Sequence, residues 1–124
     1  MTKLDNPFHT YVEDLFANLG RIRIRKMFDG AGVYSGEDMF ALIDKDRVYV
    51  KSDDALGESL RSEGGEVFEW TNPNTGKTIQ MSYVSLPVDA LDNRDAASAW
   101  GRKALDVAIQ ARRAKVKSPR RMTF

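Results

Sequence analysis

The chain has no cysteine and only one histidine among its 124 residues. The absence of cysteine excludes a thiol nucleophile, a disulfide framework and a thiolate zinc site. A single histidine excludes a metal centre held by several imidazoles. No apolar run approaches the roughly 18 residues that a membrane-spanning helix needs. The N-terminal stretch carries acids where a signal peptide would be apolar. We therefore expect a soluble, cytoplasmic protein with no membrane contact.

The charge is distributed unevenly along the chain. Residues 1–93 contain 10 lysines and arginines against 16 acidic residues, whereas residues 94–124 contain 9 against 2. An acidic body with a basic end is typical of proteins that bind nucleic acid or an acidic partner. It is also typical of a solvated helix and tail, because exposed helices are often rich in lysine and arginine.

The first helix is indicated by apolar residues that recur every three or four positions from Phe8 to Leu19. Asn6 followed by Pro7 is a helix start signal, and Gly20 is a candidate C-cap. The apolar face is rich in aromatic residues, so it must pack against something broad, such as a sheet.

Two further helices are expected, a short one after Asp53 and a long one from about Arg94, capped by Asn93 or Asp92. Alanines along the long helix allow it to pack closely. Its apolar pattern ends at residue 114. We therefore predict one domain over residues 1–114 and a basic tail without regular structure over residues 115–124.

Short apolar segments separated by turn residues predict strands, and the first of them alternates strictly between isoleucine and arginine. The connecting loops are too short for crossover helices, so neighbouring strands must be antiparallel. The order of elements predicts an α+β fold, with a mostly antiparallel sheet flanked by the N-terminal and C-terminal helices. The predicted strands are residues 21–28, 33–34, 39–43, 48–51, 66–70 and 78–86.

No constellation in the sequence supports catalysis. His9 has no neighbouring nucleophile or orienting carboxylate, and we interpret it as a surface or capping residue. The acidic pairs fall in turns, helix starts or exposed helix faces, where acids are common, and the acidic turns lack the pattern of a calcium loop. Gly30 and Gly32 lack the third glycine, the lysine and the helix of a phosphate loop, so we predict a structural turn there, a bulge or tight bend. We expect no enzyme, cofactor or metal site.

Two groups of cations are candidate binding residues. The first lies on the solvent side of the first strand, where it would contact phosphates or an acidic partner, or protect an edge strand from aggregation. The second places six cations in ten residues, which would give salt-sensitive phosphate contacts or serve only to solubilise the tail. The first group is Arg21, Arg23, Arg25 and Lys26, and the second is Arg112, Arg113, Lys115, Lys117, Arg120 and Arg121.

Four large aromatic residues, Tyr49, Trp70, Tyr83 and Trp100, are expected in the core or on a face of the sheet. If the outer face of the sheet is uncovered, some of them would form an apolar patch for a partner or a second subunit.

The segment RKMFDGAGVYSGEDMFALI, residues 25–43, resembles the N-terminal domain of the TfoX/Sxy family of competence regulators. The likeness continues through DRVYVKSD, MSYVSLPVDALDN and AWGRKALDVA, and it covers about residues 8–112. The resemblance implies a fold similar to that of secretion chaperones, which often form homodimers. Members typically carry a second, helical C-terminal domain, which we do not expect in this sequence.

The resemblance implies a non-enzymatic protein-interaction domain with a partner in the transcription machinery. The basic strand face would then supply contacts, with Gly30 and Gly32 as scaffold. A different hypothesis is direct binding of nucleic acid through the basic C-terminal helix and tail. DNA and a second copy of the chain therefore stand beside a protein partner as expected ligands.

Overall fold

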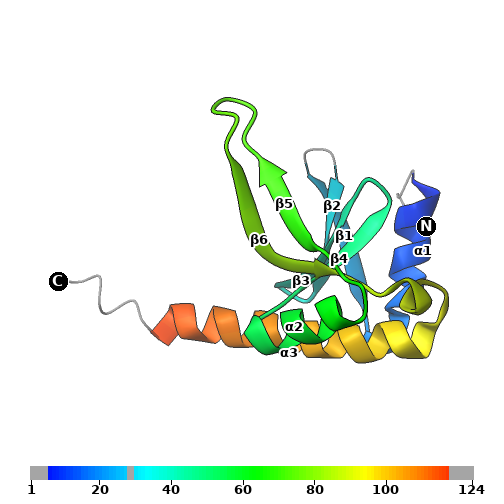
Figure 1. Cartoon of the computed structure of the whole chain (residues 1–124). Coiled ribbons are helices and arrows are strands. Elements are labelled where there is room, and N and C mark those ends of the chain that lie inside the picture. Colours follow the sequence, from blue (N-terminus) through cyan, green and yellow to red (C-terminus); the bar gives the residue numbers. More distant parts are fainter. Residues whose placement is uncertain (1–5, 28–29, 118–124) are drawn as a thin grey trace.

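A computed structural model describes residues 6–27 and 30–117, and it is built on one six-stranded antiparallel sheet (Figure 1). The strand order β1-β2-β3-β4-β6-β5 is a simple meander up to β4, after which a helix intervenes. The predicted α+β class and the antiparallel sheet are confirmed. The strands are β1 (Ile22–Met27), β2 (Gly30–Ser35), β3 (Asp38–Asp44), β4 (Arg47–Lys51), β5 (Val67–Thr71) and β6 (Thr78–Ser85).

Helix α1 (Pro7–Leu15) begins where the sequence predicted, because the Asn6 side chain accepts a hydrogen bond from the Phe8 backbone N–H at 2.8 Å. The α-helix is shorter than expected. Its last predicted turn is the 3₁₀ segment η1 (Ala17–Leu19), which ends at Gly20 with φ of +107°.

The other two α-helices also begin at side-chain caps. Asp53 accepts a hydrogen bond from the Leu56 backbone N–H at 2.8 Å, and Asn93 accepts one from the Ala96 N–H at 3.0 Å. Asn93, rather than Asp92, is therefore the cap of the long helix. The elements after β4 are α2 (Asp54–Ser62), the 3₁₀ segment η2 (Val88–Asp92) and α3 (Arg94–Lys117).

Helix α3 continues to Lys117, three residues beyond the boundary that its apolar pattern predicted. The sequence has lost its apolar spacing at this end, but lysine is a good helix former and the helix continues without it. The remainder of the predicted tail, residues 118–124, lies outside the described residues.

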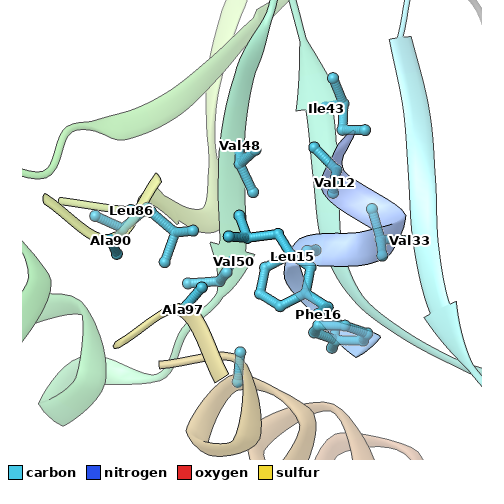
Figure 2. Close-up of a cluster of buried hydrophobic side chains, with 14 of the residues drawn as sticks. Val12, Leu15, Phe16, Val33, Ile43, Val48, Val50, Leu86, Ala90 and Ala97 are labelled. Carbon is cyan, nitrogen blue, oxygen red and sulfur yellow. The ribbon is translucent and has the colours of Figure 1, made fainter. Parts of the chain in front are cut away.

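The main core lies between the helices and one face of the sheet. Figure 2 shows Val12, Leu15 and Phe16 of the N-terminal helix region directed toward strand residues such as Val33 and Val50. The residues that α3 buries in this core are small, whereas Trp100 and Leu105 are only partly buried against it. Phe16 packs edge-on against Phe40 at 5.2 Å between ring centroids. The small residues of α3 are Ala97, Gly101, Ala104 and Ala108, all buried.

A bulge in β3 lets two consecutive residues enter this core. Val33 pairs with Ala41, but the next residue, Tyr34, pairs with Met39, so Phe40 is the extra residue. Phe40 and Ala41 are both fully buried in the main core cluster, whereas Met39 packs against a separate cluster.

Gly30 and Gly32 lie inside β2, paired with Met27 and Arg25, so the predicted turn at these residues is wrong. Residues 28 and 29 lie outside the described residues. The bulge lies instead beside Val33 and Tyr34 in the β2–β3 pair, and its extra residue belongs to β3. At Gly30 the cause is close packing, because a Cβ there would stand 2.0 Å from the Ile43 carbonyl oxygen.

We predict that Gly30→Ala destabilises the fold by about 1–3 kcal/mol or more, because the backbone of β3 must shift. Gly32→Ala is the matched control. Its Cβ would meet the Met39 Sδ at 2.9 Å, the end of a side chain that can rotate away. Urea unfolding measures both, and an equal loss in the two variants would contradict the prediction.

Candidate functional site

The sheet has a second face, here called the open face, on which no α-helix of the described residues packs. It carries its own small apolar cluster, in which Leu42, Tyr49 and Tyr83 are buried and Met39 and Phe68 are packed against them. The ring of Phe68 lies 4.9 Å from that of Tyr49. The aromatic patch predicted for an uncovered sheet face is therefore present.

A hollow of about 300 Å³ lies on this face, between the β5–β6 hairpin and the first three strands. Three of its methionine and tryptophan side chains are substantially exposed: Met27 at 36% and Trp70 and Met81 at 39% each. Exposed apolar side chains that share one concave site are typical of a binding surface. We call this hollow the open-face groove, and its side chains are Met27, Met39, Leu42, Phe68, Trp70, Met81 and Tyr83, with Asp44 at its border.

The residues that line the groove come from two parts of the sheet, the β5–β6 hairpin and strands β1–β3. The β5–β6 hairpin rises away from α3 and stands apart from the β1–β2 hairpin (Figure 1). Strand β6 pairs with β5 at Thr78–Gln80 and again at Val84, and it pairs with β4 at Tyr83–Ser85. The register of the β5–β6 pair shifts between Gln80 and Val84. The hairpin thus bends out of the plane of the other strands and forms the second wall.

Cations on the open face lie over tyrosine rings. The Arg23 guanidinium lies 5.0 Å from the centroid of Tyr34, and the Lys51 ammonium lies 5.3 Å from that of Tyr83. Arg47 lies 5.5 Å from Tyr49 and also forms an exposed ion pair with Glu66. A cation within about 6 Å of a ring centroid is attracted to the ring and is thereby held in place. The tyrosines therefore hold positive charge on this face.

The two buried tyrosines of this face are not bases. Burial raises the pKa of Tyr83 to about 12, with a smaller contribution from neighbouring Tyr34. Burial also raises the pKa of Tyr49, although nearby Arg47 opposes the change. Both hydroxyls keep their protons at neutral pH, so they can donate hydrogen bonds to a bound partner but cannot abstract a proton.

The cations of the predicted basic strand lie on two different faces of the sheet. Side chains of a strand alternate between faces, and Ile22 is buried in the main core, so Arg23 and Arg25 lie on the open face. Exposed Arg21 directly precedes the strand. Lys26 belongs to the opposite face, where its charge acts on His9.

The C-terminal cluster is divided as well. Arg112 donates to Asp38 from Nε at 2.7 Å and from Nη2 at 3.2 Å, and Glu37 lies 3.6 Å away. These contacts raise the pKa of Arg112, the hydrogen bond to Asp38 being the largest cause. Arg112 therefore ties α3 to the β2–β3 turn. Arg113 and Lys115 are exposed, and Lys117 is the last residue of α3. Arg120 and Arg121 lie outside the described residues.

We predict that Arg112→Met lowers the urea midpoint of unfolding clearly more than Arg113→Met does. The Asp38 side chain is only 10% exposed, and removal of its cation leaves a desolvated carboxylate without a partner. Arg113 is the control, since it is exposed on the same helical turn. Equal midpoints for the two variants would show that the contact with Asp38 does not stabilise the fold.

His9 is buried, at 6% exposure, so its assignment as a surface or capping residue is wrong. It lies on the inner side of α1 with Val12, and its Nδ1 has no hydrogen-bond partner in the structure. Burial lowers its pKa, the charge of Lys26 lowers it further, and Asp46 opposes the change. This environment favours the neutral imidazole.

We predict that the free energy of unfolding falls as pH drops below His9's ordinary pKa of 6.5. There the unfolded chain binds a proton that folded His9 binds only at lower pH, so protons favour unfolding. Above that pH, His9 is neutral in both the folded and the unfolded chain, so its protonation no longer lowers the free energy of unfolding. Urea unfolding on both sides of the ordinary pKa measures it, with His9→Gln as reference. If wild type and variant lose stability in parallel on acidification, the prediction is wrong.

Three further observations concern metal binding, a second hollow and membrane crossing. Over residues 6–27 and 30–117, no three histidine or acidic side chains are grouped in a way that could hold a metal ion. A more open hollow of about 640 Å³ separates α2 from α3, with Asp53, Lys103 and Asp106 at its wall. Among the helices of the same residues, none is long and apolar enough to cross a membrane.

Comparison with known proteins identifies the family. Residues 14–108 match the TfoX N-terminal domain, and the chain belongs to this family. It is similar to DNA transformation protein TfoX1 of Aliivibrio fischeri, with 29% identity over 85 residues. The match covers 68% of this chain and 39% of that relative. The chain therefore corresponds to less than half of the relative's length.

Sequence reasoning anticipated part of this site. The four aromatic residues lie in the core or on a sheet face, as predicted: Trp100 packs against the main core, and Tyr49, Trp70 and Tyr83 belong to the open face. The three methionines of the groove were missed because they come from β1, β3 and β6. The signal that could have found Met81 is the alternation of Ile79, Met81 and Tyr83 along its strand.

Proposed function

We propose that this domain is a non-catalytic protein-interaction module in the regulation of DNA transformation, and that it binds its partner through the open-face groove. The observation that carries the proposal is the exposure of Trp70 and Met81 in an apolar hollow on the face that the helices leave uncovered. Similarity to a DNA transformation protein supports the biological setting.

The groove suits a short protein segment. Methionine side chains adapt to differently shaped apolar partners, and tryptophan supplies a large contact area. Met27 and Met81 stand on opposite walls, and Leu42 and Tyr83 lie between them. An apolar side chain of a partner that enters between the walls would lose its contact with water and bury Trp70 at the same time.

Charge indicates which segment fits. Arg23, Arg25 and Lys51 belong to the open face, and Asp44 is the acid at the border of the groove. A partner with apolar residues flanked by aspartate or glutamate would complement both features. Such charges mainly speed association and select the partner, while the apolar contacts supply affinity.

A second candidate function is direct binding of nucleic acid through the end of α3. Exposed Arg113 and Lys115 support it. Arg112 is already engaged by Asp38 and Glu37, so fewer cations of this cluster remain for phosphates than the sequence suggested.

Selection from a random peptide library tests the first proposal. We expect wild-type protein to enrich peptides with apolar residues flanked by acids, and Met81→Glu to abolish their binding by placing a charge in the groove. Ile79→Glu is the matched control, because Ile79 is on the same strand and face but outside the groove. Enriched peptides that bind Met81→Glu as well as wild type would place the interface elsewhere.

Fluorescence anisotropy with duplex DNA across a salt series separates the second candidate from the first. We expect wild type and the double variant Arg113→Gln/Lys115→Gln to behave alike and to bind only weakly at low salt. Affinity that falls steeply with salt and is reduced by the double variant would instead favour nucleic-acid binding. The measurement uses the chain through Phe124 rather than a truncated one, so that the contact between Arg112 and Asp38 is kept.

A further inference from the structure

The two edges of the sheet have opposite chemistry. The β1 edge is guarded by arginine and lysine from residue 21 to residue 26, as edge strands usually are. The β5 edge has the sequence VFEWT, with two aromatic residues and one acid, and Glu69, Trp70 and Thr71 are all exposed. Within the described part of the chain, β5 pairs only with β6. An exposed apolar edge of this kind is a template for another strand.

The hydrogen-bond pattern of the β5–β6 hairpin shows which N–H and C=O groups of β5 point away from β6. Asn72 N–H donates to the Lys77 carbonyl at 2.8 Å, and the hydroxyls of Thr71 and Thr78 lie 2.8 Å apart, as in a close non-hydrogen-bonded pair. Because antiparallel pairs alternate, Trp70 is hydrogen-bonded toward Ile79 in β6. The N–H and C=O groups of Glu69 and Thr71 therefore point to the outer edge.

We propose that two copies of this chain pair through β5 in antiparallel orientation, with Trp70 opposite the partner's Trp70 on the twofold axis. In this register Glu69 and Thr71 each exchange backbone hydrogen bonds with the partner's Thr71 and Glu69. The two sheets become one continuous sheet, and a single patch on each copy makes the whole contact, as a twofold interface requires.

One alternative register with the same hydrogen-bond phase places Glu69 opposite the partner's Glu69. Like charges directly opposite one another destabilise a strand pair. The Trp70 register avoids this contact and forms an aromatic pair at a non-hydrogen-bonded position, where side chains approach most closely. It also covers indole surface that is 39% exposed in the single chain.

Because the β5 edge is complementary to itself in this register, its partner is a second copy of the chain. The proposal does not depend on the peptide-binding function of the groove. Two grooves would lie side by side on one face of the joined sheet, because Trp70 belongs to the open face of each copy. Both contacts bury Trp70, so we separate them with variants that keep this residue: we expect Glu69→Pro to remove the dimer contact and Met81→Glu to remove the groove contact.

Sedimentation equilibrium of the full chain tests the proposal. We expect a concentration-dependent monomer–dimer equilibrium that is lost in Glu69→Pro and kept in Glu69→Ala. Proline at this position removes an outward N–H without breaking a bond to β6, and edge strands tolerate it. Circular dichroism checks that the variant is folded. A wild type that stays monomeric, or a folded Glu69→Pro variant that still dimerises, overturns the proposal.

Single cysteines test the register without relying on the proline variant. The chain has no cysteine, so an introduced thiol can pair only with its copy in another molecule. We expect Trp70→Cys to form a disulfide-linked dimer under mild oxidation much faster than Glu69→Cys does. Opposed non-hydrogen-bonded residues have Cβ atoms close to disulfide distance. Faster linkage through Glu69→Cys would establish the other register, and equal slow linkage in both would argue against β5 pairing.

Discussion

The structure depends on one constraint: the α-helices of the described residues contribute to a single core, on one face of a six-stranded sheet. The helical side chains that enter this core include Val12 and Phe16 from the N-terminal region and Leu60 of α2, while α3 contributes small residues that let its backbone approach the sheet. Within residues 6–27 and 30–117, no comparable layer covers the other face. Tyrosine, leucine and methionine side chains around Tyr49 and Tyr83 shield that face from water only in part. The groove is the part of the sheet surface that this arrangement leaves accessible.

Much of the fold could be read from local pattern. Asn6 and Asp53 are caps because their short side chains reach backbone N–H groups, and this depends only on nearby residues. Strand alternation placed Arg23 and Arg25 correctly for the same reason. The bulge at Phe40 could not be read in this way, because it depends on the pairing of β2 with β3. Gly30 is likewise determined by the carbonyl of Ile43, a contact between separate strands.

The candidate site was less predictable than the fold, since its residues meet only after the strands are ordered. Charge runs in the sequence proved to be poor guides. Arg112 is paired with the buried carboxylate of Asp38 at the start of β3, and Lys26 lies on the opposite face of the sheet from Arg23 and Arg25. His9 looked like a surface residue because a lone histidine carries no periodic signal, whereas the structure buries it on the inner side of α1. Each of these outcomes was decided by long-range contacts.

The register shift in the β5–β6 pair has a geometric consequence. Strand β6 is paired with β5 on both sides of the shift, at Gln80 and at Val84, and at Val84 it is also paired with β4. The residues between these positions include Met81, which lines the groove, and helix α2 packs against the same strand. The hairpin wall of the groove and the helical layer on the opposite face therefore share one strand as their support.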